Sequence, residues 1–135
     1  MRCTGAESFV TGEAADMKVE IKKYCNVAIV KPHGDIRVKT ILALKSQFEA
    51  LEKEGVAKIA VDLSMVDFLD SSGIGLLANF AKRLHKRNGR MCLYNYSDDV
   101  KHLLDITGIE QAMNLYDTEE QMKQGMMGGD DGPAS

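Results

Sequence analysis

The sequence predicts a single α/β domain with a mostly parallel sheet of four to five strands, an antiparallel N-terminal pair and about four helices. Short apolar runs typical of strands alternate with longer segments whose apolar residues recur at helical spacing. Only a few residues separate the first two strands, and a connection this short requires antiparallel pairing. The length of 135 residues is enough for one domain with a core of its own.

The strands are predicted from apolar runs and from alternation. Residues 18–23 alternate polar and apolar, which predicts a half-buried strand. A tight turn near residues 24–26 leads to a second strand at residues 26–30, and Pro32 ends it. The remaining strands are expected at residues 58–63, 91–94 and 112–116.

The helices follow from apolar stripes and from their end signals. They are expected at residues 40–55, 72–88, 97–108 and 118–123. Ser71 or Ser72 can cap the second helix by accepting a hydrogen bond from a free backbone N–H, and Ser97 can cap the third. Gly55, Gly89 and Gly108 are expected at the ends of the first three helices. Cations crowd the last turns of the second helix, where the helix dipole favours them: Lys82, Arg83, Lys86 and Arg87.

Composition divides the chain into a domain and two tails. Residues 1–16 show no sustained period and are interpreted as a disordered leader. Residues 17–124 form the domain. Residues 125–135 are rich in Gly and Asp and are interpreted as a disordered tail.

Charge and cysteine content exclude several classes of function. The net charge of −3 gives no basic footprint for nucleic acid and argues against direct membrane binding. No apolar run approaches the length of about 18 residues that a membrane span needs. Cys3, Cys25 and Cys92 are odd in number and widely spaced, which indicates neither disulfides nor a zinc site. Cys25 and Cys92 are expected to be small buried hydrophobes, and the protein is expected in the cytoplasm.

The most informative stretch is residues 61–75, Val-Asp-Leu-Ser-Met-Val-Asp-Phe-Leu-Asp-Ser-Ser-Gly-Ile-Gly. It predicts a buried strand, a loop and then a helix start that carries two hydroxyls beside a carboxylate. By itself, this pattern indicates a helix cap followed by a glycine that allows close packing.

The stretch resembles the STAS family of anti-sigma-factor antagonists, in which an Asp-Leu-Ser strand end precedes a Phe-x-Asp-Ser-Ser-Gly-x-Gly signature. The resemblance extends to the Gly-Asp-Ile turn at residues 34–36, the helix end at residues 83–89 and the segment at residues 100–108. It covers about residues 17–122. Where the family commonly has an acid after the Gly-x-Ile turn, this chain has Arg37.

This resemblance implies a phosphorylation switch. The first serine of the signature is the family's phosphoacceptor, which here is Ser71. The implied partners are an anti-sigma factor that is also a serine kinase and a serine phosphatase that reverses the modification; the chain itself would be a monomer or weak dimer. The implied partner-binding residues are Asp35, Ile36, Arg37, Asp70, Ser71, Ser72 and Gly73. A phosphate would add a charge of about −1.5 to −2 beside Asp70 and repel an acidic partner surface.

Rival functions fit the sequence less well. Residues 73–78 match G-x-G-x-x-A, but no acid stands about 20 residues later to hold a ribose. A serine hydrolase would need G-x-S-x-G, and His33, His85 and His102 are scattered. We therefore expect no catalytic residue, no metal and no cofactor, and a protein that is not an enzyme. The alternative kept open is a STAS scaffold or accessory subunit of a signalling or membrane-transport complex.

Overall fold

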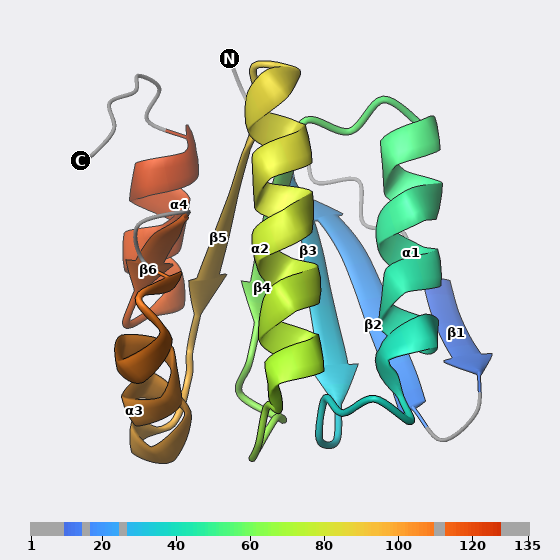
Figure 1. Cartoon of the computed structure of the whole chain (residues 1–135). Coiled ribbons are helices and arrows are strands. Elements are labelled where there is room, and N and C mark those ends of the chain that lie inside the picture. Colours follow the sequence, from blue (N-terminus) through green and yellow to red (C-terminus); the bar gives the residue numbers. More distant parts are fainter. Residues whose placement is uncertain (1–9, 15–16, 25–26, 110–112, 128–135) are drawn as a thin grey trace.

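The computed structural model describes residues 10–14, 17–24, 27–109 and 113–127. Six strands form one sheet whose spatial order follows the sequence (Figure 1). The strands are β1 (Val10–Ala14), β2 (Met17–Tyr24), β3 (Val27–His33), β4 (Lys58–Asp62), β5 (Arg90–Tyr94) and β6 (Asn114–Tyr116). The helices are α1 (Ile41–Lys53), α2 (Ser71–Lys86), α3 (Asp98–Thr107) and α4 (Glu119–Met127).

The pairing of the strands confirms the predicted fold class. β2 and β3 are antiparallel, as their short connection requires. The pairs β3–β4, β4–β5 and β5–β6 are parallel, and each is joined through a helix. The carboxyl ends of β3 and β4 therefore lie at the same edge of the sheet, and the loops that follow them meet there.

The structure adds one strand to those expected. β1 pairs antiparallel with β2 along its whole length, so the expectation of disorder over residues 1–16 does not hold for residues 10–14. The positions that alternate on one face of β1 are Val10, Gly12 and Ala14, which carry too little apolar surface to give a strand signal. The rest of the expected leader lies outside the described residues, as do Cys3, Cys25 and the start of the last predicted strand at Ala112.

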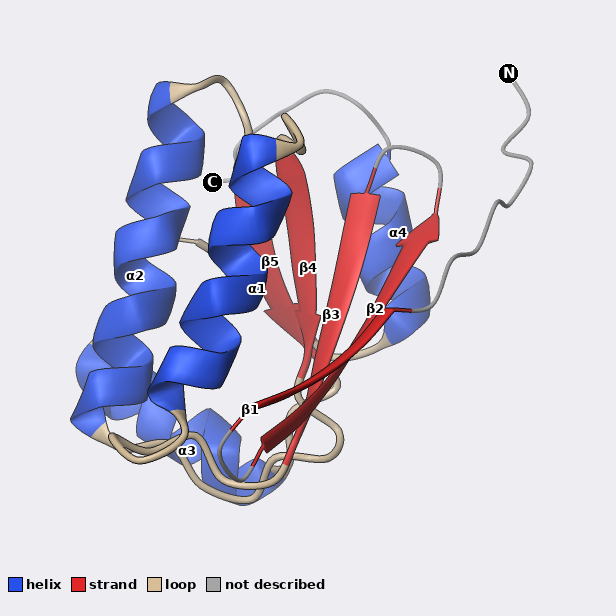
Figure 2. Cartoon of the chain, turned by 90° about the vertical axis from the view of Figure 1, so that its right-hand side faces the viewer, coloured by secondary structure: helices blue, strands red, loops and turns tan. Residues whose placement is uncertain are grey.

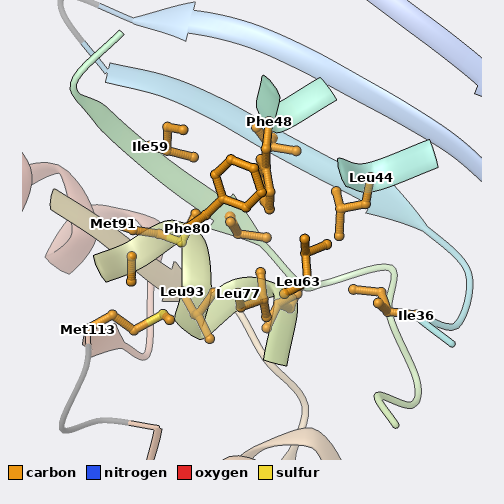
Figure 3. Packing of buried hydrophobic residues seen from close by; sticks show 14 of the residues in the cluster. Ile36, Leu44, Phe48, Ile59, Leu63, Leu77, Phe80, Met91, Leu93 and Met113 are labelled. Carbon is orange, nitrogen blue, oxygen red and sulfur yellow. The ribbon is translucent and has the colours of Figure 1, made fainter. Parts of the chain in front are cut away.

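The helices cover the sheet on two sides. α1 and α2 pack on one face and α4 on the other (Figure 2). The larger core lies under α1 and α2, where the rings of Phe48 and Phe80 meet with centroids 5.2 Å apart (Figure 3). α4 extends to Met127, beyond the predicted boundary, because Met122 and Met126 are four residues apart and both are buried against the sheet. Residues 128–135 of the expected tail lie outside the described residues.

The helix ends confirm some predictions and correct others. Gly55 and Gly108 adopt positive φ angles of 86° and 71° just past α1 and α3, as expected. After α2 the left-handed residue is Asn88, with φ of 64°, and not Gly89. Gly89 is required for a different reason, because a Cβ there would stand 2.0 Å from the carbonyl oxygen of Ala57.

None of the helices in the described ranges is both long enough and apolar enough to cross a membrane.

Candidate functional site

Two loops that are far apart in the sequence join at the carboxyl edge of the sheet. The first follows β3 at residues 34–38, and the second follows β4 at residues 65–70. Three backbone hydrogen bonds of 3.0 Å connect them: Gly34 N–H to the Met65 carbonyl, Ile36 N–H to the Phe68 carbonyl, and Asp70 N–H to the Ile36 carbonyl. Ile36 is fully buried and fixes the first loop to the core. The two loops therefore form one continuous surface.

Asp70 holds this surface to the start of helix α2. Its Oδ1 accepts a hydrogen bond of 3.0 Å from the backbone N–H of Gly73, so Asp70 is the N-cap of α2. Its Oδ2 accepts another of 3.0 Å from the N–H of Val38 in the first loop. The expectation that Ser71 or Ser72 caps the helix was therefore wrong. A carboxylate has two oxygens, so one can accept from the first loop while the other accepts from the start of α2.

Ser71 and Ser72 are the first two residues of α2, and their exposure differs. Ser71 is exposed and Ser72 is half-buried. Within the described part of the chain, the Ser71 hydroxyl has no hydrogen-bond partner. Because Asp70 performs the capping, the Ser71 side chain stays accessible at the positive end of the helix dipole.

Gly73 is buried where α2 approaches the first loop. A Cβ at Gly73 would stand 2.6 Å from Cγ2 of Ile36 and 3.2 Å from its carbonyl oxygen. This confirms the interpretation that the glycine of the motif allows close packing. The neighbouring Gly75 has open space around its missing Cβ.

Arg37 lies between an acid and an aromatic ring. Its Nη2 donates a hydrogen bond of 3.0 Å to Oδ2 of Asp35, and its guanidinium carbon lies 4.9 Å from the centroid of the Phe68 ring. The guanidinium is thus oriented over the second loop while remaining exposed to solvent. Of the residues named from the sequence as partner-binding, Asp35, Arg37 and Asp70 are accessible at this surface, whereas Ile36 and Gly73 are buried and support it from beneath.

Sequence reasoning missed the exposed apolar side chains that flank the site. They are Val38 (65% exposed), Leu42 (68%), Met65 (47%) and Phe68 (37%). Their exposure could have been expected from their positions in the predicted elements. Three lie in loops, and Leu42 lies off the stripe by which α1 packs on the core. Exposed apolar groups on neighbouring loops are typical of a protein-binding surface.

The groups that could activate the Ser71 hydroxyl or hold a metal are engaged elsewhere or dispersed in the described part of the chain. Ser71 has a carboxylate beside it in sequence, but Asp70 is engaged by two backbone N–H groups. His33 bonds to Glu20 of β2, while His85 and His102 are exposed on α2 and α3. Across the described residues, no group of three or more His, Cys, Asp or Glu side chains could hold a metal ion.

The comparisons with known proteins agree with this geometry. The model of the STAS domain family matches residues 18–122. The anti-sigma F factor antagonist of Paenibacillus polymyxa is 28% identical over 77% of this chain and 90% of its own length. The anti-sigma-B factor antagonist of Staphylococcus epidermidis is 29% identical over 67% of this chain and 84% of its own.

A solved structure supports the fold independently. The crystal structure of an anti-sigma factor antagonist from Mycobacterium paratuberculosis superposes with a TM-score of 0.76, at 23% identity, over 85% of this chain and 97% of its own. The matched residues include both loops and the whole of α2. The chain therefore belongs to the STAS domain family.

Proposed function

We propose that this protein is an anti-sigma-factor antagonist. Its surface around unmodified Ser71 binds an anti-sigma factor that has serine kinase activity, and a phosphate on Ser71 ends that binding. The relatives from Paenibacillus polymyxa and Staphylococcus epidermidis carry this role in their names, for two different sigma factors. They support the class of partner rather than one particular sigma factor.

The observation that carries the proposal is the placement of the Ser71 hydroxyl. It is exposed and without a hydrogen-bond partner in the described residues, and the two loops joined beside it carry the exposed apolar side chains Val38, Met65 and Phe68. A kinase can reach such a hydroxyl, and a partner seated on the apolar surface covers it. The contact surface thus contains the atom that the partner's kinase activity modifies, and the phosphate remains inside that surface.

A phosphate on Ser71 would change the interface more than the fold. The start of α2 presents backbone N–H groups and the positive end of the helix dipole, which stabilise an anion. The partner, however, would meet a new charge of about −1.5 to −2 in the centre of its contact surface. Like charges that face each other across an interface cost several kcal/mol.

The remaining parts of the proposal follow from this role. A serine phosphatase restores the binding form, and the cycle takes place in the cytoplasm. The protein is the substrate of the kinase and the phosphatase and has no turnover of its own. It uses no cofactor and no metal.

The test combines phosphate mapping with binding. The full chain is incubated with the anti-sigma factors of its host and ATP, and the phosphate is located by mass spectrometry. We expect it on Ser71, with full labelling of Ser72→Ala and none of Ser71→Ala. Ser71→Ala should bind the anti-sigma factor as the unmodified protein does, and Ser71→Asp should bind it about tenfold more weakly or worse. Phosphate on Ser72 alone, or binding to none of the host's anti-sigma factors, would contradict the proposal.

A further inference from the structure

A groove lies between α2 and the end of α3, lined by residues of both. Its floor is apolar and consists of Ile74, Ala78 and Ile109, all buried or half-buried. Its outer edge carries the exposed cations Lys82 and Lys86, with His85 between them. The open volume is about 710 Å³.

The spacing along α2 makes these residues one stripe. Residues 74, 78, 82 and 86 follow one another at intervals of four, so they lie on one side of the helix. The stripe begins three residues after Ser71, which places the phosphorylation site at its N-terminal end. A partner that covers Ser71 can therefore continue into the groove without leaving α2.

The positive charge in the groove has no counterpart in the described part of the chain. On the other side of α2, Arg83 and Arg87 form ion pairs with Glu52 of α1. Lys82 and Lys86 have no acidic partner among the described residues, and no carboxylate lines the groove there. The helix dipole accounts for cations in the last turn only, so it explains Lys86 but not Lys82 one turn earlier.

The geometry points to this groove as a second docking surface, which takes an acidic segment of the anti-sigma factor anchored by an apolar side chain. This inference rests on the proposed function and names the chemistry of the partner. The apolar floor would bury the anchor, and the two lysines would pair with the carboxylates beside it. A phosphate on Ser71 would then lie at the end of the groove that holds the acidic segment. Repulsion between the phosphate and the segment's carboxylates would add to the repulsion that ends binding.

The experiment measures the affinity of the full chain for the purified anti-sigma factor of its host at low and high salt. The variant is Lys82→Glu/Lys86→Glu. The control is Lys18→Glu/Lys53→Glu, which makes the same change in net charge at two exposed lysines on β2 and α1, outside the groove. Circular dichroism and thermal unfolding verify that both variants are folded.

We expect the groove variant to bind about tenfold more weakly at low salt, and the loss to shrink at high salt because exposed charges are screened. The control should match the unmutated protein within about twofold. Equal affinity of the groove variant and the control would overturn the docking surface and leave the proposed function standing. Failure of the unmutated, unphosphorylated chain to bind would overturn both.

Discussion

At the scale of single residues, Arg37 shows how a surface charge can be held in place. Its guanidinium is bonded to Asp35 and lies over the ring of Phe68. Both groups lie on the surface where the partner is proposed to bind. A relative with an acid at this position would present the opposite charge, so Arg37 is placed to influence which partners are accepted.

We predict that Arg37→Asp alters partner binding and leaves the fold intact. An exposed ion pair and an exposed cation–π contact each contribute no more than about 1 kcal/mol, so the free energy of unfolding should fall by about 1–2 kcal/mol at most. Binding to the host's anti-sigma factor should weaken by about tenfold, because reversing a charge at an interface costs more than removing it.

The measurement compares the host's anti-sigma factor with that of a relative, each with and without phosphate on Ser71. Arg37→Lys is the matched control, since it keeps the charge and loses the planar guanidinium. A guanidinium can also hold a phosphate through two hydrogen bonds, in which case both substitutions would change the properties of the phosphorylated form. Four affinities equal to those of the unmutated protein would show that Arg37 has no part in recognition.

At the scale of elements, the sequence predicted what depends on local pattern. The stripes of α1 and α2 and the central strands β3, β4 and β5 were found because their apolar residues recur at fixed spacing. β1 was missed because it pairs with β2 through its backbone, and its small side chains give no apolar pattern from which a strand could be predicted. Periodicity reports burial, and it does not report which strand edge remains free to pair.

The site could be predicted in part, for a similar reason. The motif identified Ser71, Asp70 and Gly73, but it did not show which of them caps the helix and which hydroxyl stays exposed. The choice of Asp70 as N-cap depends on the N–H of Val38, which reaches the site only after folding. The exposed apolar surface also depends on tertiary packing, because an apolar residue in a loop is buried or exposed according to what covers it.

At this same scale, two glycines of α2 provide a matched pair of substitutions. Gly73→Ala should destabilise the protein, since the new Cβ would stand 2.6 Å from Cγ2 of Ile36 and force the first loop away from α2. We expect a loss of about 1–3 kcal/mol, typical of overpacking. Gly75→Ala should instead stabilise by about 0.5–1 kcal/mol, because it has open space and lies inside the helix.

Urea unfolding of the two variants tests this prediction. If the position of the first loop matters for function, Gly73→Ala should also bind the anti-sigma factor more weakly. Gly75→Ala should fold more stably, and its binding should change only if the partner contacts this exposed position. Equal stability of the two variants would mean that the contact between Gly73 and Ile36 does not constrain the fold.

At the scale of the whole molecule, the two faces of the sheet differ in chemistry. Both cores contain two buried methionines, but only the cluster under α4 also buries side chains that can titrate, Cys92 and Tyr94. Burial raises the pKa of the Cys92 thiol. Burial, together with the nearby Asp62 carboxylate, also raises the pKa of the Tyr94 hydroxyl. Both side chains are therefore held neutral in the folded state.

This second core predicts a loss of stability in alkali. In the unfolded chain a thiol ionises near pH 8.5 and a tyrosine near pH 10, whereas the folded protein keeps both protons to higher pH. Above about pH 8.5 the folded state therefore binds more protons than the unfolded state, and the free energy of unfolding must fall as the pH rises. One fully linked group gives a slope approaching 1.4 kcal/mol per pH unit, so Cys92 acts first and Tyr94 adds to the loss above about pH 10.

The contribution of Cys92 can be separated by comparing slopes rather than absolute stabilities. Cys92→Ala leaves a small cavity and should be less stable at neutral pH. Its stability should nevertheless fall less steeply from about pH 8.5 upward than that of the unmutated protein, since the linked thiol is gone. The difference in slope should persist above pH 10, because the folded protein still keeps the Cys92 proton there. Urea unfolding at half-unit intervals from pH 7 to 11, in a reducing buffer, gives both curves. Parallel curves over the whole alkaline range would show that Cys92 is not linked to folding, and would place the alkaline loss on tyrosine alone.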